Sequence, residues 1–266
     1  MKATMLLDEG KPKVPPPVLK RMLEKAGFEV GDHRPDIGVV VGGDGRFSRY
    51  GRIEDIPLLF VGVRSRRGTG SKAFMAKVQL YQLPETLQKI RLGQYRVENH
   101  RRLEVLKNGK VLGRVFTDVY LQRGADSGCI RYRVKATGDG VKIREAGVGD
   151  GIVVSTSAGS SGYYSYPDRI KGAVVDPQAH TIIGKDLIGV CHLVPTYTER
   201  EGSNERPLRY TLPWGTVVEL SIFRHADARI YGTSDSHEGV RVDVGDTVTV
   251  RPSESVTRII VPHGKV

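Results

Sequence analysis

Residues 37–45 read IGVVVGGDG, and this stretch decides the fold class of the chain. The β-branched run follows Pro35 and predicts a buried parallel strand over residues 36–41. Parallel strands bring their carboxyl ends to the crevice where open α/β sheets bind ligands. Glycines at that end let the backbone approach a ligand closely, because they lack a Cβ. Asp44, the carboxylate among these glycines, is therefore placed to accept a proton or to hold a hydroxyl.

The same GGDG stretch also suits an ordinary turn. Gly and Asp dominate turns generally, and in that interpretation Asp44 bonds only to nearby backbone. The stretch alone does not separate the two interpretations. A second motif, more than a hundred residues later, favours the ligand site.

The segments around this strand predict a small α/β domain. Residues 14–27 carry a helical apolar stripe, with Pro17 in the first turn and Gly27 suited to a left-handed cap. Residues 55–63 predict another buried strand, and residues 84–93 a short helix that begins near proline and ends at glycine. We place this domain at residues 1–96, with its parallel sheet carrying the GGDG motif.

After residue 96 the sequence pattern changes and becomes typical of short strands. Asn108-Gly109, flanked by apolar runs at 101–106 and 111–121, is a strong hairpin signal. These strands predict a mostly antiparallel, sandwich-like β-rich domain over residues 97–255. We expect the tail, residues 256–266, to pack back on the first domain. Further short strands are expected at 130–135, 152–156, 216–223, 240–243 and 247–250.

The composition fits a globular protein that attracts polyanions. The net charge of +11 favours nucleic acid, anionic lipid or a substrate with several phosphates. The most basic segment, Arg64 to Lys72, is either a solvated loop or a loop that grips phosphate, and it lacks the Walker A spacing. Aromatic residues make up 7% of the chain and no nucleic-acid module is recognisable, so nucleic-acid binding is not expected.

Other classes are disfavoured by what the sequence lacks. No apolar stretch approaches the roughly 18 residues of a membrane span, so no membrane association is expected. Cys129 and Cys191 lie far apart, and the histidines show no metal-ligand spacing, so we expect neither a disulfide framework nor a metal site. The expected location is the cytoplasm.

The second motif lies at residues 149–163, GDGIVVSTSAGSSGY. A predicted strand ends there in small and hydroxyl residues and stops at Tyr163. Hydroxyls can bond a sugar or an amide, and Tyr163 can stack on a base. The alternative is a Ser/Gly-rich surface turn. The spacing does not form Gly-x-Ser-x-Gly, which excludes a hydrolase elbow.

In order and separation, the two motifs resemble those of the NAD kinase family. GGDG matches at residues 42–45, and the later motif matches at Asp150-Gly151 and Thr156 to Tyr163. The segments at 95–105 and 116–119 also fall where the family has comparable ones, so the likeness runs over roughly residues 36–260.

The resemblance implies a kinase that transfers a phosphoryl group from ATP or polyphosphate to the 2′-hydroxyl of the adenosine ribose of NAD, giving NADP. Asp44 would be the base, and Mg²⁺ would arrive on the nucleotide. The partners would be NAD and ATP, and the protein would be a homo-oligomer, a dimer or tetramer, with Asp150 near the other end of the ligand, across a subunit contact. The implied nucleotide-binding positions are Gly42, Gly43, Gly45, Arg46, Thr117, Asp118, Asp150, Thr156, Ser160, Ser161, Gly162 and Tyr163.

Two positions depart from the family pattern. Arg46 stands where the family has Thr or Ser, and Thr117 stands where it has Asn. These departures keep two alternatives open. One is a related kinase for another nucleoside, sugar or lipid hydroxyl, and the other is a non-catalytic NAD(P)- or nucleotide-binding protein.

Overall fold

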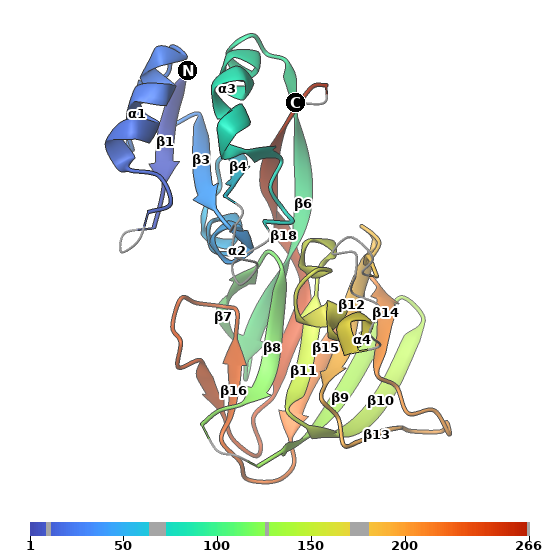
Figure 1. Cartoon of the computed structure of the whole chain (residues 1–266). Coiled ribbons are helices and arrows are strands. Elements are labelled where there is room, and N and C mark those ends of the chain that lie inside the picture. The colour runs from blue at the N-terminus through green and yellow to red at the C-terminus, as the bar shows by residue number, and fades with distance from the viewer. Residues whose placement is uncertain (9–11, 64–72, 126–127, 171–180, 265–266) are drawn as a thin grey trace. The chain divides into compact units, whose positions relative to one another are not determined.

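The structure is a computed structural model that describes residues 1–8, 12–63, 73–125, 128–170 and 181–264 (Figure 1). The chain divides into two compact units, which we call the α/β unit (residues 1–100 and 256–266) and the β-rich unit (residues 101–255). Two long strands, β6 (Tyr95–Lys107) and β18 (Val248–Pro262), continue from one unit into the other. The basic segment Arg64 to Lys72 lies outside the described residues.

The α/β unit is built on a parallel sheet. Its strand order is β18-β4-β3-β1-β2. The short strand β5 pairs with Val61 and Gly62, the last two residues of β4. The strands are β1 (Lys2–Leu6), β2 (Glu29–Val30), β3 (Ile37–Gly42), β4 (Leu58–Gly62) and β5 (Val78–Gln79). The helices are α1 (Pro16–Lys25), α2 (Asp44–Ile53) and α3 (Leu83–Arg91), with a short 3₁₀ turn at Leu80–Gln82 before α3.

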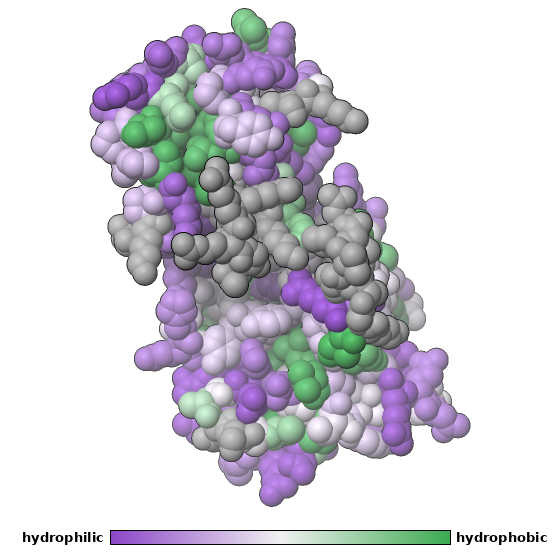
Figure 2. Space-filling model, in the orientation of Figure 1, coloured by the Kyte–Doolittle hydropathy of each residue, from purple (hydrophilic) through white to green (hydrophobic). Residues whose placement is uncertain are grey.

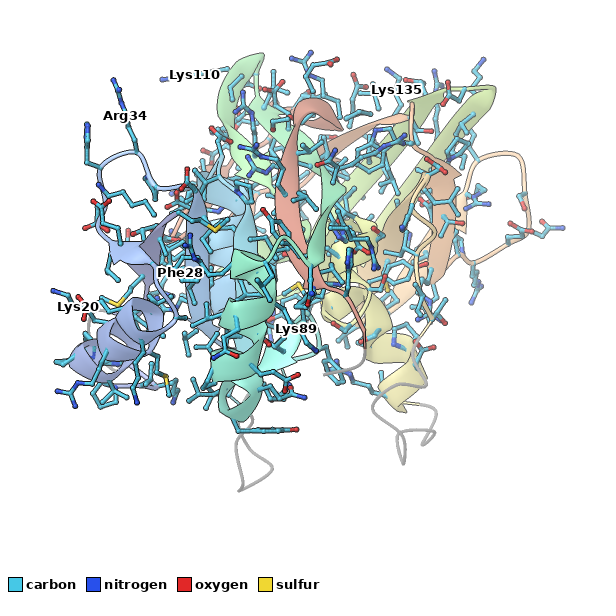
Figure 3. The ribbon with its side chains drawn as sticks, turned by 90° about the horizontal axis from the view of Figure 1, so that it is seen from above. Lys20, Phe28, Arg34, Lys89, Lys110 and Lys135 are labelled. Carbon is cyan, nitrogen blue, oxygen red and sulfur yellow. The ribbon has the colours of Figure 1, made fainter. Side chains whose placement is uncertain are left out.

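Burial explains why β3 and β4 have no polar alternation. Every residue of both strands is buried, as expected for parallel strands covered on both faces. The apolar sides of α1 and α3 pack in the same core, and Ile260 of β18 joins them. Figure 3 shows the side chain of Phe28 inside this unit, whereas those of Lys20 and Arg34 point outward.

The predicted helices at 14–27 and 84–93 are observed as α1 and α3, and Gly27 takes a left-handed φ of 83° after α1. Helix α2 was not predicted, because its sequence DGRFSRYGRI contains two glycines and few apolar residues. It is held in place by tertiary contacts. Phe47 stacks on Phe60 of β4 at 4.6 Å, and the Thr257 hydroxyl donates to the carbonyl of Gly51.

The β-rich unit contains two antiparallel layers. One has the order β13-β10-β9-β15-β18 with the hairpin β6–β7, and the other has the order β14-β12-β11-β8-β16-β17. Apolar side chains from both layers, such as Val134 and Leu121, form one core, so the predicted sandwich-like arrangement and the fold class are confirmed. The strands are β7 (Lys110–Val115), β8 (Asp118–Arg123), β9 (Ile130–Gly138), β10 (Val141–Gly149), β11 (Gly151–Ser155), β12 (Leu187–Leu193), β13 (Tyr197–Arg200), β14 (Arg209–Pro213), β15 (Val217–Ile222), β16 (Ala228–Tyr231) and β17 (Val240–Val242).

The hairpin at Asn108-Gly109 is confirmed, since both residues have positive φ, 50° and 79°, as a type I′ turn requires. The apolar run at 111–121 forms parts of two strands, β7 and β8. The chain breaks at Phe116–Thr117, where it leaves β7 in one layer and enters β8 in the other. The strand expected at 247–250 is the beginning of the much longer β18. Among the described residues, no helix is long and apolar enough to cross a membrane.

A buried polar network ties the two layers of the β-rich unit together. Glu145 on β10 accepts hydrogen bonds from Arg200 (2.8 Å) and the Tyr210 hydroxyl (2.7 Å), and its other contact is His192 Nε2 at 3.1 Å. His192 Nδ1 in turn lies 2.8 Å from the Tyr132 hydroxyl. Burial opposes ionisation of Glu145, but the hydrogen bonds from His192, Tyr210 and Arg200 outweigh it and lower the pKa of the carboxyl.

Candidate functional site

The GGDG motif ends β3 beside the end of β4. Gly42 and Gly62 are paired across these parallel strands, and the Val63 amide donates to the Gly42 carbonyl at 3.0 Å. A Cβ on Gly62 would lie 2.7 Å from the Ala76 Cβ, so this strand end admits no larger side chain. The two strands therefore terminate at the same level of the sheet, which is where ligands bind in open α/β folds.

Asp44 lies at the first turn of α2, directly after this edge. Its Oδ1 accepts a hydrogen bond from the Met75 amide at 2.9 Å, and the side chain is partly buried. The cap residue Gly43 offers no side chain to the helix N-terminus, and a Cβ at Gly45 would meet nothing within 4 Å. The first amides of α2 are thus approachable, and such a terminus favours negative charge.

Arg46 has a carboxylate partner within the same unit. It forms an ion pair with Asp8, which follows β1, and its own side chain is mostly buried. The Tyr50 hydroxyl one turn later donates to the Leu7 carbonyl at 2.9 Å. These two contacts tie α2 to the segment after β1. A nucleotide-binding role for Arg46 stays a prediction.

The second motif forms a tight loop after β11 in the β-rich unit. The Thr156 hydroxyl donates to the Phe116 carbonyl at 2.6 Å and accepts from the Ala158 amide, while the Thr156 amide donates to the Thr117 carbonyl. The Ser160 hydroxyl donates to the Ser157 carbonyl at 2.7 Å and accepts from the Ile183 amide. Both hydroxyls, predicted as ligand-binding, are therefore engaged in holding the loop.

Two glycines let this loop approach the start of β8. A Cβ on Gly159 would lie 2.6 Å from the Thr117 carbonyl oxygen, and one on Gly162 would lie 2.9 Å from Asp118 Oδ2. A side chain at Gly159 would push the loop off the strand, and one at Gly162 would displace the Asp118 carboxylate. The glycines of the motif are thus needed to bring Gly162 and Tyr163 next to Asp118.

Asp118 is the most perturbed carboxyl of this region. The protein packed around it raises its pKa to about 6, although the Thr117 hydroxyl donates to Oδ1 at 3.1 Å and opposes this shift. A carboxylate kept short of hydrogen bonds is ready to accept them from a ligand. Asp118 can therefore hold amino or hydroxyl groups that donate to it.

The raised pKa gives a testable dependence of stability on pH. Between pH 4 and pH 6 the unfolded chain loses the Asp118 proton while the folded chain keeps it, so stability falls as pH rises. Relative to Asp118→Asn, the wild type should lose about 1–3 kcal/mol of unfolding free energy across this window. Urea unfolding followed by the fluorescence of Trp214, the single tryptophan, measures this. The exposed Asp186→Asn serves as control, and equal pH profiles for Asp118→Asn and wild type would contradict the prediction.

Three tyrosines pack together beside Asp118. Tyr120 lies two residues after Asp118 on the same face of β8, and it stacks on Tyr231 of β16 at 5.5 Å. Tyr163 meets the edge of Tyr120 at 5.0 Å and is 48% exposed. Burial, with the neighbouring Tyr163, Asp118 and Tyr231, raises the pKa of Tyr120 to about 12, so it stays a neutral phenol. Tyr120 and Tyr231 were not predicted, because only the pairing of β8 with β16 brings them to the motif.

Asp150 lies at the other end of β11. Six residues separate it from Thr156, which corresponds to about 20 Å along an extended strand. There Asp150 forms an ion pair with Arg123 at 2.8 Å, and its carbonyl accepts from the Arg123 amide. Within the β-rich unit, Thr117, Asp118, Gly162 and Tyr163 therefore lie together, and Asp150 does not join them.

Known proteins are similar to this chain in sequence and in fold. No protein-family model matches the chain. The NAD kinase of Geobacter sulfurreducens is 27% identical over 237 residues, covering 86% of this chain and 74% of that protein. The NAD kinase of Picrophilus torridus is 23% identical over 242 residues, covering 91% and 79%. This chain is similar in sequence to NAD kinases over most of its length.

Solved structures of NAD(H) kinases have the same fold. The yeast NADH kinase complexed with NADH superposes with a TM-score of 0.71 at 14% identity, covering all of this chain and 84% of that one. The NAD kinase from Archaeoglobus fulgidus in complex with ATP has a TM-score of 0.66 at 19% identity, covering 97% and 93%. The predicted family resemblance is confirmed, and the described fold is that of NAD kinases.

Proposed function

We propose that this protein is an NAD kinase, which transfers the γ-phosphoryl group of ATP to the 2′-hydroxyl of the adenosine ribose of NAD. The observation that carries the proposal is the Asp44 carboxylate at the end of β3, in a GGDG motif, in a chain similar in sequence to NAD kinases. The solved relatives in complex with NADH and with ATP support the same two ligand classes.

Asp44 is the base in this proposal. As the ribose oxygen attacks the γ-phosphorus, its proton passes to the Asp44 carboxylate, and the bond from phosphorus to the β,γ-bridging oxygen breaks. The Met75 amide, which donates to Oδ1, holds the Asp44 carboxylate in one orientation, in which it takes the ribose proton. Phosphoryl transfer asks mainly for such positioning and for charge stabilisation. The unprotected first amides of α2, beside Gly43 and Gly45, supply donors for phosphate oxygens.

The β-rich unit binds the nucleoside part of NAD. Asp118 accepts hydrogen bonds from donors on the nucleotide, and the exposed face of Tyr163 stacks on a base. Thr117 stands where the family has Asn, and its hydroxyl donates to Asp118 Oδ1 at 3.1 Å, which helps to orient that carboxylate. Tyr120, which stacks on Tyr231, also contacts the Tyr163 ring and helps to hold that ring in place.

A divalent ion fits this proposal when it is held chiefly by the donor's phosphates. Among the described residues, no group of three or more His, Cys, Asp and Glu side chains could hold a metal ion. Mg²⁺ prefers octahedral oxygen ligands and often keeps substrate phosphates and waters among them. When bound, it would offset charge on the phosphates being transferred. Polyphosphate as the donor is a further possibility that the assay below decides.

The test is an end-point assay of the purified full chain with NAD, Mg²⁺ and either ATP or polyphosphate. We expect NADP, identified by mass spectrometry and by an NADP-specific dehydrogenase. Binding of NAD without turnover would instead favour a non-catalytic nucleotide-binding protein. Consumption of ATP only with another nucleoside, sugar or lipid acceptor would favour a related kinase.

Tyr163 should contribute strongly to NAD affinity. Base–aromatic stacking is worth about 1–3 kcal/mol, so Tyr163→Ala should weaken NAD binding by about 5- to 150-fold. Tyr163→Phe should keep most of the affinity because the ring remains. Titration calorimetry without donor measures this, with Tyr197→Ala as a control at another partly exposed tyrosine of the β-rich unit. Equal affinities for Tyr163→Ala and wild type would show that the base lies elsewhere.

We also propose that the protein is a homo-oligomer that works in the cytoplasm. The Asp150–Arg123 pair is placed at the end of β11 remote from Asp118, where the resemblance puts a subunit contact. Both cysteines are free, as is usual in reducing compartments. Light scattering of the purified chain tests the dimer or tetramer.

A further inference from the structure

Several chain turns converge at the end of the β-rich unit that holds Asp150, the lower end in Figure 1. Arg131 and Val148 are paired across β9 and β10, and the Phe223 amide donates to the Arg131 carbonyl at 3.1 Å. This bond fixes the β15–β16 connection beside the start of β9. The turns enclose an open cavity of about 630 Å³, whose lining includes Cys129, Arg131, Arg224 and His225.

The ionisable side chains described in the cavity lining include bases and no carboxylate. The bases are two arginines and a histidine. Nearby arginines are each paired: Arg229 with Asp227 at 2.8 Å and Arg241 with Asp243 at 2.9 Å. By contrast, no carboxylate of the described residues forms an ion pair with Arg131 or Arg224. Figure 2 shows hydrophilic residues at this lower end of the unit.

We propose that this cavity binds a phosphate-bearing anion of the pyrophosphate type, at the opposite end of β8 and β11 from Asp118. Arginine forks bond phosphate oxygens through two parallel N–H groups, and two such forks facing one space suit a ligand with two phosphates. The Cys129–His225 cavity lies at the Asp150 end of β11, about 20 Å along the strand from Thr156. The site requires neither Asp44 nor Asp118.

Cys129 provides a direct reporter of occupancy. It is exposed and lines the cavity, whereas Cys191 is buried and its pKa is raised by that burial to about 12. A thiol reagent at neutral pH should therefore modify Cys129 and spare Cys191 in the folded chain. An anion held by Arg131 and Arg224 covers the thiol and slows that reaction.

The experiment follows modification of the full chain by N-ethylmaleimide, a neutral reagent, with peptide mass spectrometry. We expect inorganic pyrophosphate to slow labelling of Cys129 saturably. In Arg131→Gln and Arg224→Gln the half-protecting concentration should rise at least about tenfold for each arginine lost. The matched control is Lys142→Gln/Arg144→Gln, which removes the same charge from exposed positions of β10 and should keep the protection.

Two results would overturn the proposal. One is unchanged protection in the Arg131→Gln/Arg224→Gln double variant. The other is slowing that sodium chloride reproduces at equal ionic strength, since that is non-specific screening. The Asp44→Asn variant should keep the protection, so failure of this proposal and failure of the proposed kinase activity are distinguishable. Circular dichroism of each variant shows whether it folds.

Discussion

Asp44→Asn should lower kcat for NADP formation by about 10²–10⁴-fold, because the amide cannot take the ribose proton. The substitution is nearly isosteric, and the Asn Oδ1 can still accept from the Met75 amide that contacts Asp44 at 2.9 Å. The position of the loop before β5 should therefore be kept. The affinity for NAD should change little, since the residues proposed to bind it lie on the β-rich unit.

The matched control is Asp36→Asn. Asp36 precedes β3, at the strand end opposite Asp44, and accepts a hydrogen bond from the Lys2 amide. It undergoes the same change of charge at the other edge of the same sheet, and its kcat should equal that of wild type. Single-turnover measurements with saturating NAD and ATP isolate the transfer step. A variant Asp44→Asn that keeps full activity would remove Asp44 as the base.

Glu145→Ala should destabilise the β-rich unit by about 3–5 kcal/mol, because it breaks a buried ion pair and leaves its partners without a counter-charge. Arg200, His192 and the Tyr210 hydroxyl all converge on this one carboxylate. Removal also leaves a space beside the buried His192 and the partly buried Tyr210 and Arg200. Urea unfolding followed by Trp214 fluorescence gives the free energy difference.

The exposed pair Lys135–Glu219 supplies the control for Glu145. Its atoms are 2.7 Å apart, but both side chains are well exposed, so Glu219→Ala should cost less than about 1 kcal/mol. The lowered pKa of Glu145 adds a pH test. Its contribution is present above the ordinary carboxyl pKa and is lost as the pH falls through the lowered value. Similar losses of unfolding free energy for Glu145→Ala and Glu219→Ala would contradict the prediction that the buried network stabilises the unit more than the exposed pair does.

Much of the architecture could be predicted from local pattern. The uninterrupted apolar run at 37–41 indicates burial on both faces, which a parallel strand under helices provides. Asn108-Gly109 specifies its own turn, because both residues tolerate positive φ. Strand β10 was missed although it alternates, because Gly147 interrupts the pattern. A Cβ there would lie 2.5 Å from the Tyr132 ring, so a contact with the neighbouring strand requires the glycine.

The sequence named candidate residues for the site, but it did not give their contacts. The two motifs pointed to Asp44, Asp118 and Tyr163, and the similarity to NAD kinases agrees with those motifs. The sequence did not show that the hydroxyls of Thr156 and Ser160 donate to backbone carbonyls, those of Phe116 and Ser157. The partners they bond lie up to forty residues away in the chain.

The sequence by itself determined that residues 37–41 are buried, that the chain turns at Asn108-Gly109, and which residues are candidates for chemistry, because these follow from side-chain type and short spacing. The tertiary structure alone decided that residues 44–53 form a helix, since the stack of Phe47 on Phe60 holds it against its poor propensity. It also decided that Asp118 has a raised pKa and that Tyr120 and Tyr231 stack beside it. Desolvation and ring packing depend on neighbours brought from distant parts of the chain, and no local pattern encodes them.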